Sequence, residues 1–137
     1  MREIKFRGLD KRGVWHYGYF WKAGDNSCFI KEEVSKNNYA DFEVLPESVG
    51  EWIGLQDKNG KDIYEGDIMI IYEHIYDENE EYNCKEITHY TQVIWDNYNS
   101  KFTTDKHYNV IFDFESSEVI GNIYENPEIL KGVEKKK

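Results

Sequence analysis

The chain has 137 residues, a formal net charge of −10 at neutral pH, 16% aromatic residues and only two prolines. Its length predicts one compact domain, and the aromatic content favours a mostly β fold over a disordered or linker-rich protein. The negative charge argues against binding to the phosphate backbone of nucleic acid, which depends on Lys and Arg.

Cellular location follows from the N-terminus and the cysteines. The first five residues carry charges and no apolar stretch, so we expect no signal peptide. No run approaches the roughly 18 apolar residues of a membrane-spanning segment, so we expect no membrane contact. Cys28 and Cys84 form no Cys-x-x-Cys pair, which indicates a reducing compartment and a cytoplasmic protein. Whether the two thiols are free or joined stays open.

The N-terminal third predicts a β-hairpin followed by a less regular region. Residues 4–9 and 14–20 alternate between opposite faces around a Gly-containing turn at 10–13. Residues 31–50 are largely polar, and we expect a connection there with at most one helical turn. Within it, Val44 and Leu45 form a short strand that ends at Pro46.

The segment 52–72 organises the rest of the chain. It is predicted to form three strands separated by two turns. Asp57, Asn59 and Gly60 belong to the first turn, because Asn and Gly tolerate the positive φ of a hairpin loop. The second turn is formed by Glu65, Gly66 and Asp67.

The C-terminal half predicts further strands and one helix. Acidic residues dominate 73–86, so we expect a solvated hairpin tip or insertion at about 73–89. Strands are predicted over 88–95, 102–104, 110–114 and 118–124. Asn126 as N-cap and Pro127 at the first helical position predict a short C-terminal helix. Residues 131–137 form a basic tail.

Together these elements predict a mostly β fold over residues 1–130. We expect a partly open barrel or sandwich of five to eight antiparallel strands, finished by the short C-terminal helix, in a single domain.

Three segments in order, 2–7, 45–68 and 119–130, carry a family signature across nearly the whole chain. They read Arg-Glu-Ile-Lys-Phe-Arg, then Leu-Pro-Glu-Ser-Val-Gly with Asp-Lys-Asn-Gly-Lys-Asp-Ile-Tyr-Glu-Gly-Asp-Ile, and finally Val-Ile-Gly-Asn-Ile-Tyr-Glu-Asn-Pro-Glu-Ile-Leu. Together they resemble the YopX family of phages and prophages of Gram-positive bacteria. The resemblance implies a mostly β, barrel-like fold, a phage or prophage origin and self-association. It implies no activity, and residues 31–44 and 73–89 lie outside the matching motifs.

Four carboxylates near the turns are candidate ligands of a hard cation. They are Asp57, Asp62, Glu65 and Asp67. Their spacing does not match the EF-hand loop, in which ligands alternate around a central Gly. Turn chemistry explains them better, with hydrogen bonds from backbone amides to Asp57 and Asp67. We therefore expect a structural turn motif.

A transition-metal or catalytic site has less support. The candidate ligands His74, Cys84, His89 and His107 lack the closely paired spacing of structural zinc sites. Neither Cys28 nor Cys84 has a flanking nucleophile signature, and no phosphate-binding glycine loop occurs. The sequence predicts no catalytic group, no metal and no cofactor.

An aromatic row suggests an interaction face. Trp15, Tyr17, Tyr19 and Trp21 alternate along one strand, with Arg7, Lys11 and Arg12 close by in the sequence. Such a face could stack the bases of a single-stranded nucleic acid, or pack across strands, or anchor a protein interface.

The sequence favours a non-catalytic phage or prophage accessory protein that binds itself or a phage or host protein. One alternative is single-stranded nucleic-acid binding through the aromatic row, which the net charge opposes. A second alternative is a carboxylate-based metal site or hydrolase at the turns.

Overall fold

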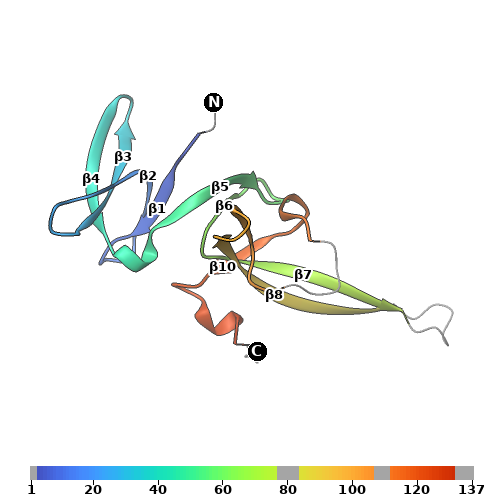
Figure 1. Ribbon diagram of the computed structural model, residues 1–137. Helices are drawn as coiled ribbons and strands as arrows, with labels where there is room; N and C mark the ends of the chain where they lie inside the picture. Colours follow the sequence, from blue (N-terminus) through green and yellow to red (C-terminus); the bar gives the residue numbers. More distant parts are fainter. Residues whose placement is uncertain (1–2, 77–83, 107–111, 132–137) are drawn as a thin grey trace. The chain divides into compact units, whose positions relative to one another are not determined.

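The computed structural model describes residues 3–76, 84–106 and 112–131 (Figure 1). These residues form ten strands in two antiparallel sheets, with three short 3₁₀ turns and no closed barrel among them. The predicted mostly β fold is confirmed. No helix among the described residues is long and apolar enough to cross a membrane.

Two compact units make up the chain, Met1–Gly54 and Leu55–Lys137. The single domain expected over residues 1–130 stays a prediction. The first unit contains strands β1 to β4 and most of β5. Their bounds are β1 (Phe6–Leu9), β2 (Trp15–Lys22), β3 (Cys28–Ser35), β4 (Asn38–Val44) and β5 (Gly50–Gln56).

The strand order of the first unit is β4-β3-β2-β1-β5, and a 3₁₀ turn at Pro46–Ser48 connects β4 to β5. Strand β1 therefore pairs with both β2 and β5. The buried core of the first unit is formed by Cys28, Ile30 and Val44. Phe6, Phe20 and Val49 pack against these residues.

Strand β2 changes partner at Gly18. Residues 15–18 pair with β1, and residues 19–22 pair with β3. A Cβ atom at Gly18 would lie 2.1 Å from the carbonyl oxygen of Lys31, so only glycine allows this close approach. Through this change of partner β2 pairs with both β1 and β3, and Phe6, Phe20 and Ile30 of the three strands pack in one core.

The polar connection expected within residues 31–50 is wrong for residues 31–43. These residues form the hairpin of β3 and β4, which pair from Cys28↔Val44 to Ser35↔Asn38. Asn37 adopts φ 61° at the turn, a conformation that Asn tolerates. The charged side chains pair across the strands instead of marking a loop, with Lys31 Nζ 3.5 Å from Asp41 Oδ1. The alternation of apolar and polar residues that marks a strand is not visible in this part of the sequence, because both faces of β3 and β4 carry polar residues.

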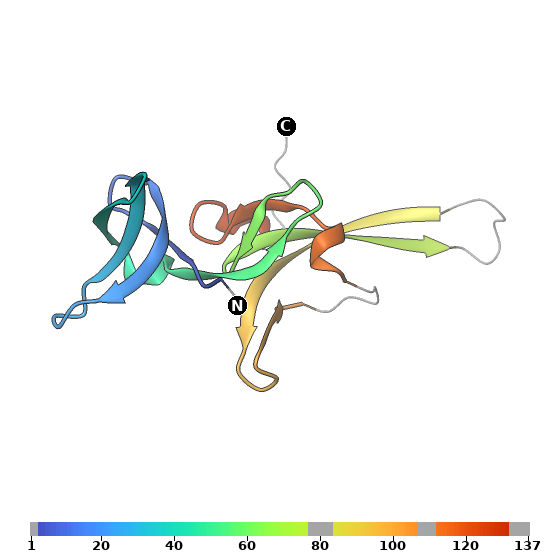
Figure 2. The ribbon, with the colours of Figure 1, turned by 90° about the horizontal axis from the view of Figure 1, so that it is seen from above.

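The second unit holds a four-stranded sheet of order β10-β7-β8-β9 (Figure 2). Its strands are β7 (Asp67–Tyr76), β8 (Cys84–Asp96), β9 (Lys101–Thr104) and β10 (Val119–Asn122), and β6 (Asp62–Tyr64) lies beside β5. Residues 84–92 of β8 pair with β7, and residues 93–96 pair with β9. Buried apolar residues of this unit include Ile63, Ile68, Met69, Val93 and Val119.

The described part of the acidic segment 73–89 is strand. Residues 73–76 and 84–89 belong to β7 and β8 and pair with each other, and 77–83 lie outside the described residues. The strand predicted at 110–114 is wrong for its described part. Residues Phe114–Ser116 form a 3₁₀ turn, because the Asp113 carboxylate accepts from the Glu115 amide (3.1 Å) and the Ser116 hydroxyl (3.0 Å). Residues 110 and 111 lie outside the described part.

The predicted C-terminal helix is not confirmed. The described residues contain a 3₁₀ turn at Pro127–Ile129 in its place. Asn126 makes no side-chain cap, because its Oδ1 atom accepts from the Asn122 amide (3.3 Å) at the end of β10. Of the expected basic tail, only Lys131 is described.

Replacing Gly66 tests the turn between β6 and β7. Gly66 adopts φ +92°, and a Cβ atom there would lie 3.1 Å from Tyr124 Cε2. We expect Gly66→Val to lower the free energy of unfolding by about 2 kcal/mol, because a β-branched residue is strained at this φ. Urea denaturation measures the loss. The control Gly24→Ala has open space around its Cβ position, and equal stability of the two variants would contradict the expectation.

Candidate functional site

The predicted aromatic row lies on one face of β2. Tyr17, Tyr19 and Trp21 are 45%, 60% and 39% exposed. Trp15 is partly buried, and the Arg7 guanidinium carbon lies 4.6 Å from the centre of its ring. These three exposed residues alternate along β2, and alternate residues of a strand share a face.

Trp21 is held in place by two neighbouring strands. Its ring stacks on Phe29 of β3, with 4.5 Å between ring centres and 13° between planes. Its indole N–H donates to Asp41 Oδ1 of β4 at 2.9 Å. The exposed edge of this ring is therefore presented in a defined orientation.

The surroundings of the row are more acidic than the sequence suggested. Cross-strand pairing puts Asp41 and Glu43 of β4 on the same face as Tyr19 and Trp21, with one cation, Lys31 of β3, paired to Asp41. Of the cations expected nearby, Arg7 is buried. Arg12 lies 3.4 Å from the carboxylate of Asp10. This environment suits phosphate groups poorly.

A buried polar cluster beside this face was missed at the level of sequence. His16 of β2 is 4% exposed. Its Nε2 lies 2.8 Å from Asp10 Oδ2, and its Nδ1 lies 3.1 Å from Glu32 Oε1. The ring also stacks on Phe42 of β4, with 4.0 Å between ring centres. No spacing motif marks these residues, because four different segments supply them.

The cluster joins four segments through charge and hydrogen bonds. Both ring nitrogens of His16 lie within hydrogen-bond distance of a carboxylate oxygen. Glu32 also accepts from the Tyr17 amide (2.8 Å), and Asp10 accepts from the Val14 amide (3.0 Å). The hydrogen bond from His16, with that of Val14, holds the pKa of Asp10 well below its usual range.

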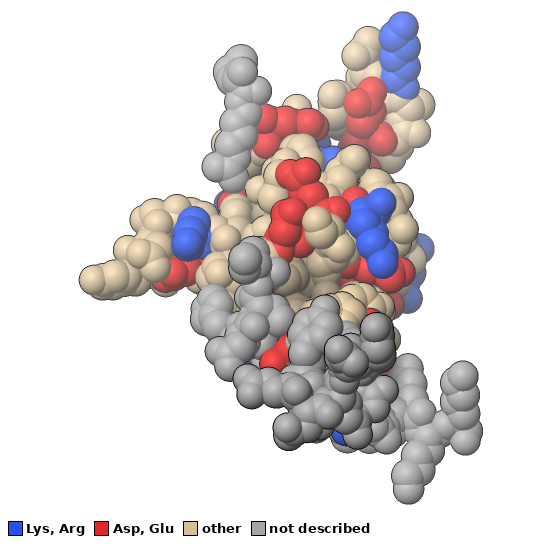
Figure 3. All heavy atoms as spheres, turned by 90° about the vertical axis from the view of Figure 1, so that its right-hand side faces the viewer, with Lys and Arg blue, Asp and Glu red and all other residues tan. Residues whose placement is uncertain are grey.

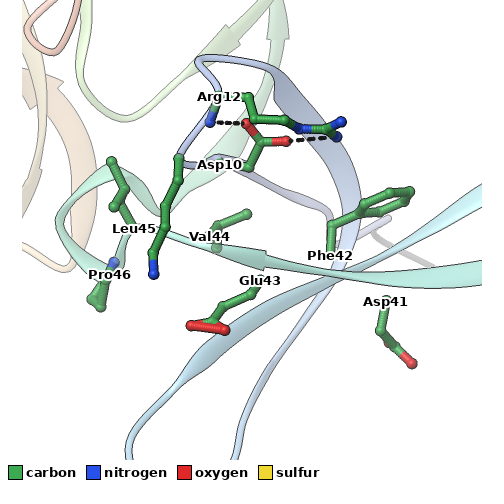
Figure 4. Close-up of a pocket in the computed structure, with 9 residues that line it drawn as sticks. Asp10, Arg12, Asp41, Phe42, Glu43, Val44, Leu45 and Pro46 are labelled. Carbon is green, nitrogen blue, oxygen red and sulfur yellow. Dashed lines mark hydrogen bonds and ion pairs between the residues drawn. The ribbon is translucent and has the colours of Figure 1, made fainter.

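A hollow of about 350 Å³ lies between the β1–β2 turn and β4 (Figure 4). Its walls combine charged side chains with apolar ones, and Figure 4 shows the Arg12 guanidinium turned toward Asp10. The lining residues are Asp10, Lys11, Arg12, Asp41, Phe42, Glu43, Val44, Leu45 and Pro46.

The carboxylate of Asp57 is occupied by backbone amides. Oδ1 accepts from Asn59 and Lys61 at 2.9 Å each, and Oδ2 accepts from Val119 of β10 at 2.9 Å. Burial raises the pKa of Asp57, but these three hydrogen bonds outweigh it and lower the pKa overall. Oδ1 therefore closes the turn itself, and Oδ2 holds the turn against β10.

The remaining residues of the turn motif have similar backbone roles. Asp67 is buried and accepts from the Tyr64 amide at 2.8 Å. Gly66 donates to the Val93 carbonyl and accepts from the Ile123 amide, both at 2.9 Å. Asn59 and Gly60 are exposed at the tip of the first turn, and Glu65 is partly exposed in the second.

The candidate metal ligands are not brought together in the described part of the chain. No group of three or more His, Cys, Asp or Glu side chains there could hold a metal ion. His89 faces Glu73 across the β7–β8 ribbon (2.7 Å), and His74 faces Glu86 (3.8 Å). Cys28 is a buried free thiol. His107 lies outside the described residues, as does the side chain of Cys84.

Comparison with known proteins gives one family and a structural relative. The family described as "YopX protein" matches residues 5–131. The crystal structure of protein EF1440 from Enterococcus faecalis is similar, with a TM-score of 0.54 and 23% identity. That likeness covers 95% of this chain and 99% of the other, and it concerns the fold alone. No curated protein matches the chain.

Asp10 should control the acid sensitivity of the first unit. Its pKa in the folded state lies below the unfolded value of about 3.9. The carboxylate therefore stabilises the fold above that value, and this contribution is lost as the pH falls toward the folded-state pKa. We expect Asp10→Asn to be less stable at pH 7 and to lose stability less steeply between about pH 5 and pH 3. Urea titrations across this range measure both slopes, and parallel slopes would contradict the assignment.

Asp57 should be essential to the second unit. In Asp57→Asn, one acceptor oxygen becomes an NH₂ group that faces a backbone N–H. We expect a loss of about 2 kcal/mol in unfolding free energy, the scale of a buried hydrogen bond to a charged group. The control is Asp62→Asn. In the natural chain the side-chain amide of Gln56 donates to Asp62 Oδ1 at 3.2 Å, and the asparagine oxygen can still accept this hydrogen bond. Denaturation curves that show the same loss in both variants would contradict the role of Asp57.

Proposed function

This chain belongs to the YopX family, and we propose that it is a non-catalytic accessory protein of phage or prophage origin that acts by binding. The proposed binding surface is the aromatic row Tyr17, Tyr19 and Trp21 of β2. Its partner is a second copy of the chain or a phage or host protein. The proposed setting is the cytoplasm of the host cell, in keeping with the free thiol of Cys28.

The observation that carries the proposal is the exposure of three large aromatic side chains on one rigid strand. Tyr and Trp are the residues that most often dominate binding at protein interfaces. Trp21 is already ordered by Phe29 and Asp41, so binding would cost little further side-chain entropy. An exposed row of this kind is typical of a surface that another molecule covers.

The charge of the chain favours a protein partner over a nucleic acid. Acidic side chains gather on the face shown in Figure 3, in keeping with the net charge of −10. Lys31 lies opposite Tyr19 but is paired with Asp41 at 3.5 Å, and Asp41, which accepts from the Trp21 indole, would repel the phosphates of a stacked strand.

Self-association is tested by size-exclusion chromatography with light scattering at micromolar concentration. We expect an oligomer for the natural chain and a shift toward monomer in Tyr19→Ala, with the dissociation constant weakened about tenfold or more. Tyr98→Ala, whose side chain is 94% exposed in the second unit, is the matched control and should leave the mass unchanged.

Two outcomes would count against the proposal. A monomer at every concentration would contradict self-assembly. An oligomer that Tyr19→Ala leaves intact would contradict the role of the aromatic row. Titration with labelled single-stranded oligonucleotides at two salt concentrations tests the competing function, and tight, salt-sensitive binding would favour nucleic acid instead.

A further inference from the structure

Strand β4 forms the outer edge of its sheet. Among the described residues, β3 pairs with one side of β4 and no strand lies on the other side. In an edge strand, every second residue turns its N–H and C=O groups away from its partner, where another strand can pair with them. Seven residues, Asn38–Val44, offer such an edge.

A hollow follows this edge. The hollow of about 350 Å³ is lined by six consecutive residues, 41–46, together with the β1–β2 turn (Figure 4). Neighbouring residues of a strand point to opposite faces, so a hollow lined by consecutive residues lies along the edge of the strand and not over one face. Phe42, Val44, Leu45 and Pro46 make much of its wall apolar.

The two faces of β4 differ in chemistry along this edge. Asp41 and Glu43 share the outer face with their partners Lys31 and Phe29. On the other face, Val44 joins the core cluster and Phe42 stacks on His16. A strand added to β4 would thus meet carboxylates on one face and apolar side chains on the other.

Like charges disfavour a second copy of the same strand. In a symmetric antiparallel pair that overlaps β4 (Asn38–Val44) along its whole length, Asp41 of one copy would face Asp41 of the other. Like charges directly opposite each other destabilise a strand pair, whereas opposite charges stabilise it. The existing neighbour shows the favourable case, because Lys31 lies 3.5 Å from Asp41 across the β3–β4 pair.

We propose that β4 accepts an extended segment of a partner protein in which lysine or arginine alternates with apolar residues. The segment adds a strand to the sheet through main-chain hydrogen bonds. Its cationic side chains lie beside Glu43 and Asp41, and its apolar side chains enter the hollow beside Phe42 and Val44. The inference rests on the proposed function as a binding protein, but it uses the edge of β4 and not the aromatic row.

The test uses the full chain labelled with ¹⁵N and two synthetic octapeptides with blocked ends. One alternates lysine with valine, and the other alternates glutamate with valine. We expect the lysine peptide to slow hydrogen exchange at alternate amides of residues 38–44 and to bind about tenfold more tightly than the glutamate peptide. Equal affinities, or protection away from β4, would overturn the proposal.

Charge reversal separates pairing at the edge from general attraction to an acidic protein. Glu43→Lys should remove most of the preference for the lysine peptide, since it puts a cation at the pairing face. Glu115→Lys makes the same change in net charge at an exposed position of the second unit and should leave the preference intact. An equal effect of both variants would overturn the proposal.

A variant with a smaller charge change separates a loss of binding from a folding defect. Glu43→Gln removes the charge without introducing a cation and should weaken lysine-peptide binding severalfold while amide spectra elsewhere stay unchanged. Tyr19→Ala should leave peptide binding intact. Peptide protection of β4 without self-association would sustain this inference alone, and self-association without peptide binding would sustain the proposed function alone.

Discussion

One carboxylate holds together the second unit of this protein. Asp57 accepts hydrogen bonds from three backbone amides, and one of them, on Val119, lies 62 residues further along the chain. The turn between β5 and β6 is thereby attached to β10. Beside Asp57, the backbone amide of Lys58 donates to the Ser117 carbonyl at 2.9 Å. This second hydrogen bond also attaches the turn to the segment that leads into β10. Loss of the carboxylate would leave the buried Val119 amide without its acceptor, which is costly.

The first unit depends on a comparable polar centre. His16 connects Asp10 and Glu32, and its ring covers Phe42. The segments joined in this way are the ones that frame the hollow along β4 and carry the aromatic row. This network fixes the relative positions of the strands that present the proposed binding surfaces, which is the condition for pre-organised binding.

Much of the fold could be predicted from local patterns, and the failures have identifiable causes. The N-terminal hairpin was found because apolar and polar residues alternate around a Gly-containing turn. The β3–β4 hairpin was missed because its charged residues face one another, as Lys31 and Asp41 do. The C-terminal helix failed because Asn126 bonds to Asn122 of β10 instead of capping its own turn.

The candidate sites also divide into features that local patterns predict and features that depend on tertiary contacts. Local spacing identified the turn carboxylates and the row of aromatic residues, since turn formation and alternation act over a few neighbours. The sequence alone determined the family, the mostly β fold and the position of the two turns within residues 52–72. Only the tertiary structure decided that Asp57 reaches β10, that His16 lies between two carboxylates and that β4 is an edge. These features join segments distant in the chain, and local sequence carries no record of which strands meet.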